Sequence, residues 1–216
     1  MSEPVKVDIW SDVACPWCYI GKRKFEEGVR RSGQDVEVEY HSFELSPDTP
    51  VDFEGTAADF LADRKGLPRE QVTQMLDNVI GIAASVGLEY DYDALQHTNT
   101  VKAHELIHYA KAQGRQIDMK ERLLKAYFVE GRHVGRIEDL ADLAAEIGLD
   151  RAEVVQALES EQYLGDVHAD QAQAVAYGIQ GVPFFVLEGK YGISGAQDPT
   201  VFESALRQVA TERVSS

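Results

Sequence analysis

The sequence contains few cysteines: Cys15 and Cys18 are the only two among its 216 residues. A structural zinc site needs four ligands, and no second cysteine pair is present to complete one. Basic residues are also scarce, with 21 against 37 acidic ones and a formal net charge of −16. A surface this negative repels phosphate backbones and anionic lipids, so nucleic acid and membranes are excluded as expected partners.

Long apolar runs are missing as well. A membrane-spanning helix needs about 20 consecutive apolar residues, and the sequence has no such run. Residues 1–4 are polar and do not form the basic and then apolar pattern of a secretory signal, so we expect a cytoplasmic protein. A hydrophobic content of 44% is enough for one large domain or for a domain with a large insertion.

The two cysteines stand at a predicted junction between a strand and a helix. An apolar run at 5–10 precedes them, and a stretch with a helical pattern, 21–31, follows. Pro16 fits the first helical turn, where the missing N–H is not needed. Because a helix N-terminus stabilises negative charge, we expect Cys15 to be the more acidic, solvent-facing thiol and Cys18 to be the more buried one.

Three interpretations of this pair compete. The first is half of a zinc site completed by histidines; His104 and His108 share one helix face, but nothing links them to the cysteines. The second is a pair of inert core residues, since free cysteine is often buried. The strand-to-helix context and the insert between the cysteines favour the third, a redox dithiol without a metal.

A second stretch, 178–187, places Pro183 at the start of an apolar strand. Proline cannot donate to a strand ladder, so it belongs at the first residue of a strand or in a special turn. An ordinary trans proline satisfies this rule. A cis bond between Val182 and Pro183 would in addition leave the Val182 backbone beside the dithiol, ready to pair with an extended peptide. The presence of both stretches in one chain favours the cis bond.

Together the two stretches resemble the thioredoxin superfamily, and specifically its DsbA-like branch. Further segments are similar to those of the FrnE-like subfamily of bacterial DsbA-family oxidoreductases: 41–45, 99–100 with 103–104, 126–128 and 195–197. The resemblance implies a thiol–disulfide oxidoreductase that acts on protein or small-molecule disulfides through a mixed disulfide. It implies no cofactor beyond the dithiol, with glutathione as a candidate co-substrate.

The same resemblance assigns roles to individual residues. It implies that Cys15 is the nucleophile, that Cys18 is the resolving cysteine and that Pro183 is the cis-proline. Pro16, Trp17 and Val182 are then expected to contact the substrate. Trp17 carries no charge, whereas a histidine stands between the cysteines of the periplasmic DsbA, so we expect a less oxidising dithiol than in that protein.

Relatives of this branch with other activities suggest an alternative function, that of an isomerase or a glutathione transferase. 2-Hydroxychromene-2-carboxylate isomerases and kappa-class glutathione transferases resemble it, but they typically have serine where Cys15 stands. The presence of both cysteines favours the oxidoreductase.

Four polar residues are weaker candidates for supporting roles. Asp12, three residues before Cys15, is a candidate proton acceptor for Cys18. Asp8 lies on the first strand, where the alternation of side chains is expected to turn it outward. Asn99 and His104 belong to a motif that related isomerases use near their substrate; a helix cap and an ordinary polar side chain are the alternative interpretations.

The predicted fold class is α/β, a thioredoxin-like fold with a large all-helical insertion. The segment 36–43 alternates apolar and polar residues, which predicts a strand parallel to the first one. From about 56 to 175 the pattern is helical. A strand at 184–187, a turn at 188–190, an edge strand at 191–193 and a last helix to about 210 follow, with 212–216 expected to fray. The expected organisation is therefore a core at 1–50 and 166–216 with an insertion at 51–165, in a monomer or homodimer.

Overall fold

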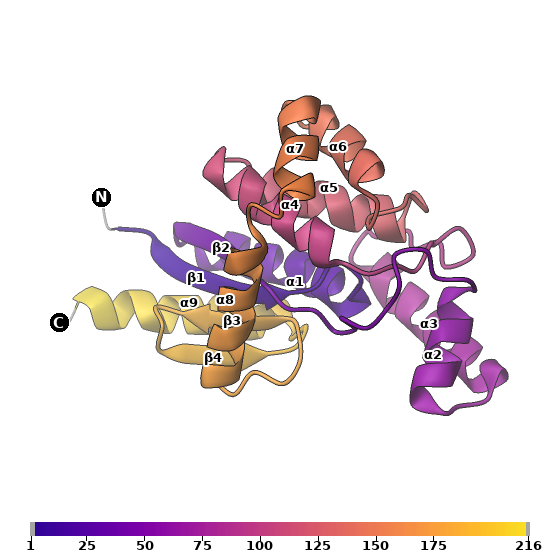
Figure 1. The fold of residues 1–216 in the computed structure, drawn as a ribbon. Coiled ribbons are helices and arrows are strands. Elements are labelled where there is room, and N and C mark those ends of the chain that lie inside the picture. Colours follow the sequence, from indigo (N-terminus) through magenta and orange to yellow (C-terminus); the bar gives the residue numbers. More distant parts are fainter. Residues whose placement is uncertain (1–2, 215–216) are drawn as a thin grey trace.

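The centre of the protein is a four-stranded sheet of order β2-β1-β3-β4 (Figure 1). The computed structural model describes residues 3–214. β1 and β2 run parallel, and β3 runs antiparallel to both β1 and β4, so the predicted strand–helix–strand unit and the hairpin are confirmed. The strands are β1 (Val5–Ser11), β2 (Val36–Ser42), β3 (Phe184–Leu187) and β4 (Tyr191–Ser194).

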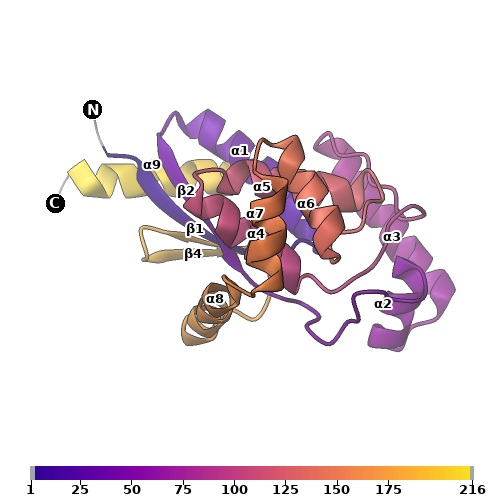
Figure 2. The same ribbon diagram turned by 45° about the horizontal axis from the view of Figure 1, so that its top comes forward.

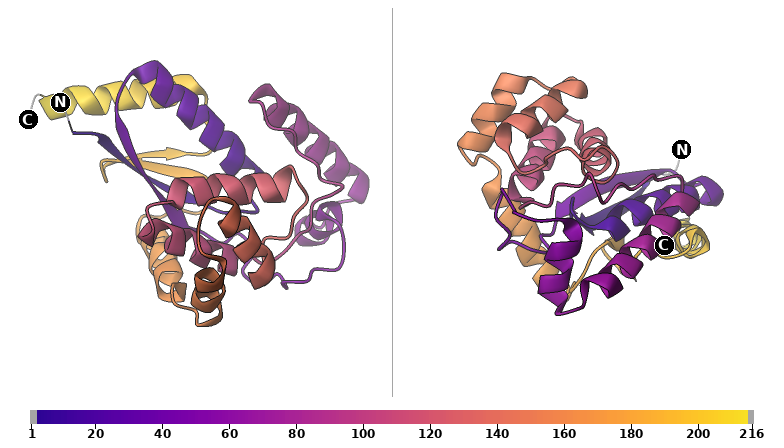
Figure 3. Two further views of the ribbon diagram at one scale, coloured as in Figure 1. Left: turned by 90° about the horizontal axis from the view of Figure 1, so that it is seen from above. Right: turned by 90° about the vertical axis from the view of Figure 1, so that its right-hand side faces the viewer.

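Two helices cover one face of this sheet, α1 (Pro16–Ser32) and α9 (Pro199–Val214) (Figure 3). Between them and the sheet the rings of Phe25, Phe185 and Phe202 pack with centroids 4.7 to 5.5 Å apart. The close approach of α1 to α9 requires a glycine, because a Cβ at Gly28 would lie 2.5 Å from the Cβ of Phe202.

The opposite face of the sheet is covered by α8 (Leu164–Ala176) (Figure 3). A smaller apolar cluster, which includes Trp10, Ala174 and Val186, lies between them. The Trp10 indole N–H donates to the carbonyl oxygen of Asp170 at 3.0 Å, so the buried ring also has its polar atom satisfied.

The helices between β2 and α8 form most of a larger core, which also includes Tyr19 and Ile20 of α1. α2 and α3 make a hairpin at the end of the molecule opposite both termini, as Figures 1 and 2 show. α4 packs against both α5 and α7, and α5 also contacts β2. These helices are α2 (Ala57–Lys65), α3 (Arg69–Ser85), α4 (Val101–Ala112), α5 (Gln116–Phe128), α6 (Ile137–Glu146) and α7 (Arg151–Glu159).

The end of the last helix differs from the prediction. α9 continues to Val214, so the fraying predicted for 212–214 is wrong, whereas 215–216 lie outside the described residues. Arg213 explains the difference, because its guanidinium donates to the carbonyl oxygens of Glu3 and Pro4 at 3.1 and 2.9 Å. These contacts hold the final turn of α9 against the start of the chain.

No helix between residues 3 and 214 combines the length and the apolarity that a membrane span requires.

Candidate active site

The two cysteines lie at the junction of β1 and α1. Cys15 is the residue before the helix, in an extended conformation, and Pro16 occupies the first helical turn, as predicted. Both thiols are free. Cys15 is only 2% exposed and Cys18 only 3%, so the prediction that Cys15 faces solvent is wrong for this reduced form.

Two segments that are distant in the sequence shield Cys15 from solvent. The Tyr90 hydroxyl donates to the carbonyl oxygen of Pro16 at 2.7 Å, which holds the segment between α3 and α4 against the start of α1. On another side, the Cys15 thiol donates to the carbonyl oxygen of Val182 at 3.6 Å. Trp17, at 39% exposure, and the half-buried Pro16 remain at the surface beside the sulfur.

The loop that carries Val182 packs tightly against α1. The peptide bond between Val182 and Pro183 is cis, as predicted. A Cβ at Gly21 would lie 2.9 Å from Cγ of Pro183, so only glycine at this position of α1 allows the loop to come so close. The Pro183 carbonyl oxygen accepts a hydrogen bond from the Gly195 N–H at 2.8 Å, which fixes the other side of the loop.

The acidity of the two thiols is opposite to the predicted order. Burial raises the pKa of Cys15 well above its usual value, and the neighbouring Cys18 sulfur and the Asp12 carboxylate raise it further. Burial also opposes ionisation of Cys18, but its hydrogen bond with Cys15, the positive charge of Lys120 and the Ser11 hydroxyl lower its pKa overall.

Asp12 is a buried anchor between the core and the helical insertion. Its Oδ1 accepts from the Val13 N–H at 2.7 Å and lies 3.1 Å from Nε2 of His104, and its Oδ2 accepts from the Leu45 N–H at 2.8 Å. Burial alone would raise the pKa of Asp12, but these bonds, that of His104 foremost, lower it to about 2. A carboxylate this acidic takes up a proton poorly at neutral pH, so the geometry favours anchoring over the predicted proton-acceptor role.

The structure gives Asn99 and His104 structural partners. Asn99 Oδ1 accepts from the Val101 N–H at 2.9 Å at the start of α4, and its amide donates to the Pro47 carbonyl at 3.0 Å. This geometry matches the helix-cap interpretation. His104 is 1% exposed and pairs with Asp12; within the described residues it makes no hydrogen bond to either cysteine.

Asp8 lies on the other face of the sheet. Its Oδ1 is 2.8 Å from Nε2 of His41, and the other ring nitrogen of His41 is 2.8 Å from Oδ1 of Asp170 on α8. The expected outward turn of Asp8 is thus observed, since β1 presents Val7 and Ile9 to α1 and α9. Asp8 therefore belongs to an ion-pair network beneath α8.

The same network contains a group of possible metal ligands, Asp8, Glu39 and His41, whose ligand atoms lie within 4.8 Å of one another. Burial of His41 disfavours its charged form, but the hydrogen bonds that its ring donates to Asp170 and Asp8 outweigh this and raise the pKa of His41 to about 9. A proton then occupies the histidine at neutral pH and competes with any cation.

We expect this histidine to make the stability of the protein depend on pH. Because the pKa of His41 is raised from 6.5 to about 9 on folding, its stabilising effect is complete below about pH 6.5 and is lost as pH rises through 9. The free energy of unfolding, measured by urea titration, should fall by on the order of 2–3 kcal/mol over this interval.

A His41→Gln variant should lack that fall. The matched control is His168→Gln, at an exposed position of α8, which should keep the wild-type pH profile. Equal slopes for wild type and His41→Gln would contradict the assignment.

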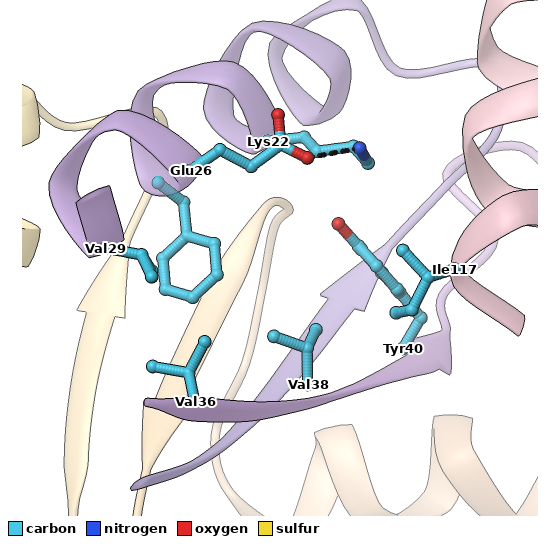
Figure 4. A pocket seen from close by; sticks show the side chains of 8 residues that line it. Lys22, Glu26, Val29, Val36, Val38, Tyr40 and Ile117 are labelled. Carbon is cyan, nitrogen blue, oxygen red and sulfur yellow. Dashed lines mark hydrogen bonds and ion pairs between the residues drawn. The ribbon is translucent and has the colours of Figure 1, made fainter. Parts of the chain in front are cut away.

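Of the hollows beside α1, two bear on the position of the dithiol. One, of about 420 Å³, adjoins the dithiol and is lined by Asp12 and Pro16 together with the basic residues Arg64 and Lys65 of α2. The other, of about 290 Å³, lies between α1, β2 and the start of α5, and Figure 4 shows its mainly apolar lining below the Lys22–Glu26 ion pair. The first hollow is the one that contains residues on both sides of Cys15, namely Ala14 and Pro16.

Sequence reasoning missed Lys120, Tyr90 and Gly21 as parts of this site. Only Lys120 could have been identified from the sequence. It lies three and four residues before Leu123 and Leu124, on the apolar face of the helix, where a charged side chain is unusual. Tyr90 and Gly21 act through contacts with segments far away in the sequence.

Comparison with known proteins agrees with this arrangement. The family model for the DSBA-like thioredoxin domain matches residues 6–207. The chain is 34% identical over 206 residues to the uncharacterized protein YwbO of Bacillus subtilis (strain 168), covering 94% of this chain and 96% of that protein. The probable DsbA oxidoreductase SCO1869 from Streptomyces coelicolor superposes with a TM-score of 0.88 and 39% identity, over 96% of this chain and 91% of that one.

Two more distant solved structures share the fold. A 2-hydroxychromene-2-carboxylate isomerase gives a TM-score of 0.75 at 17% identity, and the cytosolic disulfide reductase DsbM from Pseudomonas aeruginosa gives 0.66 at 19%; each match covers 97% of this chain and 98% of the other. The predicted thioredoxin-like fold with a helical insertion is confirmed. Since the family model spans nearly the whole sequence, this protein belongs to the DSBA-like thioredoxin domain family.

Proposed function

We propose that this protein is a thiol–disulfide oxidoreductase whose reactive groups are Cys15 and Cys18. The observation that carries the proposal is the position of two adjacent free thiols at the start of α1, opposite the Val182–Pro183 loop. Membership of the family supports the reaction class. The proposed substrates are disulfides of proteins or of small molecules.

The reaction begins with ionisation of Cys15. The Cys15 thiol loses its proton to solvent, and the resulting thiolate attacks one sulfur of the substrate disulfide. The substrate S–S bond breaks, one substrate thiolate leaves with the bonding electrons, and a mixed disulfide remains on Cys15.

Cys18 completes the exchange. It loses its proton to solvent and attacks the Cys15 sulfur, so that the mixed disulfide breaks and the second substrate thiolate departs. The substrate has then gained two electrons and the enzyme holds a Cys15–Cys18 disulfide. Two glutathione molecules can return the enzyme to its dithiol form, and the reverse sequence oxidises a substrate dithiol.

Substrate contacts are proposed for the residues that remain accessible around Cys15. Trp17 and Pro16 provide an apolar surface, and the backbone of Val182 next to Pro183 can pair with an extended peptide. For glutathione as co-substrate, Arg64 at the neighbouring hollow offers a positive charge to one of its carboxylates.

An isomerase of the 2-hydroxychromene-2-carboxylate type is the second candidate, as is the related kappa-class glutathione transferase. The shared fold and the buried Asp12–His104 pair beside the hollow favour it. The presence of Cys15, where such relatives typically have serine, supports the oxidoreductase instead.

We further propose that the protein is a cytoplasmic, FrnE-like member of the family, working as a monomer or homodimer. The similarity to DsbM, which is named as a cytosolic disulfide reductase, supports this compartment. A net charge of −16 disfavours nucleic acid as a partner.

The test is to trap the intermediate with oxidised glutathione. A Cys18→Ser variant should accumulate a stable glutathione adduct on Cys15, found by mass spectrometry of its peptides. The matched control, Cys15→Ser, should gain an adduct on Cys18 far more slowly, because Cys15 is the sulfur that contacts the Val182 backbone, where the substrate is proposed to bind. Absence of any adduct on Cys15, together with turnover of 2-hydroxychromene-2-carboxylate by the wild type, would favour the isomerase.

A further inference from the structure

One edge of the central sheet is formed by β2, which has β1 as its neighbour on the inner side. The N–H and C=O groups of successive residues in a strand point alternately to its two sides. The carbonyl oxygen of Asp35 accepts from the Val5 N–H at 2.8 Å, so the odd-numbered residues from 35 onward direct their backbone groups to β1. Val36, Val38 and Tyr40 therefore direct theirs outward.

Only the last of these three outward positions is paired. The Tyr40 N–H donates to Oε1 of Gln116 at 3.0 Å, and Nε2 of Gln116 donates to the Tyr40 carbonyl oxygen at 2.8 Å. The side-chain amide of Gln116 thus takes the place of a neighbouring strand. Within residues 3–214, the outward backbone groups of Val36 and Val38 have no such partner. A row of unpaired groups like this one is a template for another strand.

A hollow lies on each side of this free edge. The hollow of about 290 Å³ against α1 has an apolar lining that includes Phe25, Val36 and Val38 (Figure 4). A further hollow, of about 410 Å³, is lined by Glu37 and by the start of α5. Val38 and Ile117 border both hollows, so the two adjoin along the edge. Because successive side chains of a strand point to opposite faces, an added strand would place them alternately in the two hollows.

The charges at the edge indicate what kind of strand fits. Glu39 is paired with Lys111, whereas the exposed Glu37 has no ion pair in the part of the chain that the structure describes. Opposite charges on neighbouring strands stabilise their pairing, and like charges destabilise it. A second copy of β2 would bring further glutamates to this edge, and each copy has a net charge of −16. A strand that carries a basic residue opposite Glu37 is favoured instead.

We propose that the free edge of β2 binds an extended segment of a partner protein in which apolar and basic residues alternate. The segment adds a fifth strand to the sheet and pairs with the backbone of Val36 and Val38. Its apolar side chains enter the hollow against α1, and a basic side chain pairs with Glu37. Val36 lies opposite Val5, at the end of β1 away from the cysteines, so this surface is separate from the proposed reaction site.

The test is a fluorescence-anisotropy titration with a short labelled peptide in which valine and lysine alternate. We expect this peptide to bind the wild type with a Kd below about 1 mM. A control peptide with glutamate in place of lysine should bind weaker by about tenfold or more, because it brings like charges to Glu37. A Cys15→Ser variant should bind the lysine peptide as the wild type does, whether or not the proposed redox function is correct.

Two variants examine the edge itself. Glu37→Lys should weaken binding of the lysine peptide by about tenfold, whereas the matched control Glu159→Lys, at the exposed end of α7, should stay within about twofold of wild type. Val38→Pro removes one outward N–H, a change that an edge strand tolerates because that N–H faces solvent. It should weaken binding by about fivefold or more.

Amide hydrogen exchange separates strand addition from loose electrostatic attraction. With the lysine peptide bound, the Val36 and Val38 N–H groups should exchange more slowly, whereas those of Glu37 and Glu39, which face β1, should keep their rates. Unchanged exchange at Val36 and Val38 would overturn the proposal, as would a Kd above about 1 mM or equal binding of the two peptides. Self-association of the wild type that Val38→Pro abolishes would assign the edge to a second copy instead.

Discussion

A Cys15→Ser variant is expected to lose disulfide exchange almost completely. A serine hydroxyl does not form the sulfur–sulfur bond through which the reaction proceeds, and removing the nucleophile of such a mechanism costs on the order of 10³-fold or more in rate. The measurement is glutathione-coupled reduction of a small model disulfide under steady-state conditions. The substitution changes one atom at a position that the structure shows to be buried, so the fold should be retained.

Cys18→Ser serves as the matched comparison, because Cys18 is the other cysteine of the chain. It should react once and then stall at the mixed disulfide, giving a single release of thiol instead of continuous turnover. If Cys15→Ser kept more than about a tenth of the wild-type rate, a factor equal to only 1.4 kcal/mol of barrier, Cys15 would not be the nucleophile.

An Asp12→Ala variant should be destabilised by about 3–5 kcal/mol, because it removes an acceptor that is shared by three hydrogen bonds and each donor left unsatisfied costs about 1–3 kcal/mol. The Asp12 carboxylate is 1% exposed and holds three groups at once: the Val13 N–H, the Leu45 N–H and His104 of α4. Its removal leaves the buried Val13 N–H and the partly buried Leu45 N–H without an acceptor, and the buried His104 imidazole without its hydrogen-bond partner. Urea unfolding at neutral pH measures the loss.

The conservative control is Asp12→Asn, which keeps a carbonyl oxygen and most of the shape. It should cost less than the alanine variant. In either variant the loss of negative charge beside Cys15 should also lower the pKa of that thiol, since the Asp12 carboxylate contributes to raising it. A loss of stability below about 1 kcal/mol for Asp12→Ala, the size of an ordinary surface change, would contradict the anchoring role.

The sheet and most helix positions could be predicted from local pattern alone. Alternation at 36–43 identifies β2, and Pro16 correctly marks the first turn of α1. These features depend on neighbours within one or two turns, which the sequence displays directly. The end of α9 was mispredicted because Arg213 is held by carbonyl oxygens more than 200 positions earlier in the chain.

The chemical identity of the site was predictable, but its electrostatics were not. The cysteine pair carries a strong local signal, whereas the cis bond at Pro183 was indicated only by the presence of both stretches in one chain. The order of thiol acidity depends on burial under Tyr90 and on the charge of Lys120, both supplied by the helical insertion. A helix N-terminus favours a thiolate by a modest amount, and at Cys15 the loss of solvent outweighs it.

The central claim is that Cys15 and Cys18 form a reversible disulfide, and equilibrium titration against reduced and oxidised glutathione tests it most directly. We predict one two-electron transition, with both thiols open to alkylation on the reduced side and neither on the oxidised side. The reduction potential should lie above about −270 mV, the value of thioredoxin, and below about −120 mV, that of the periplasmic DsbA. If both cysteines stay alkylatable at every ratio of oxidised to reduced glutathione, the protein does not work through this dithiol.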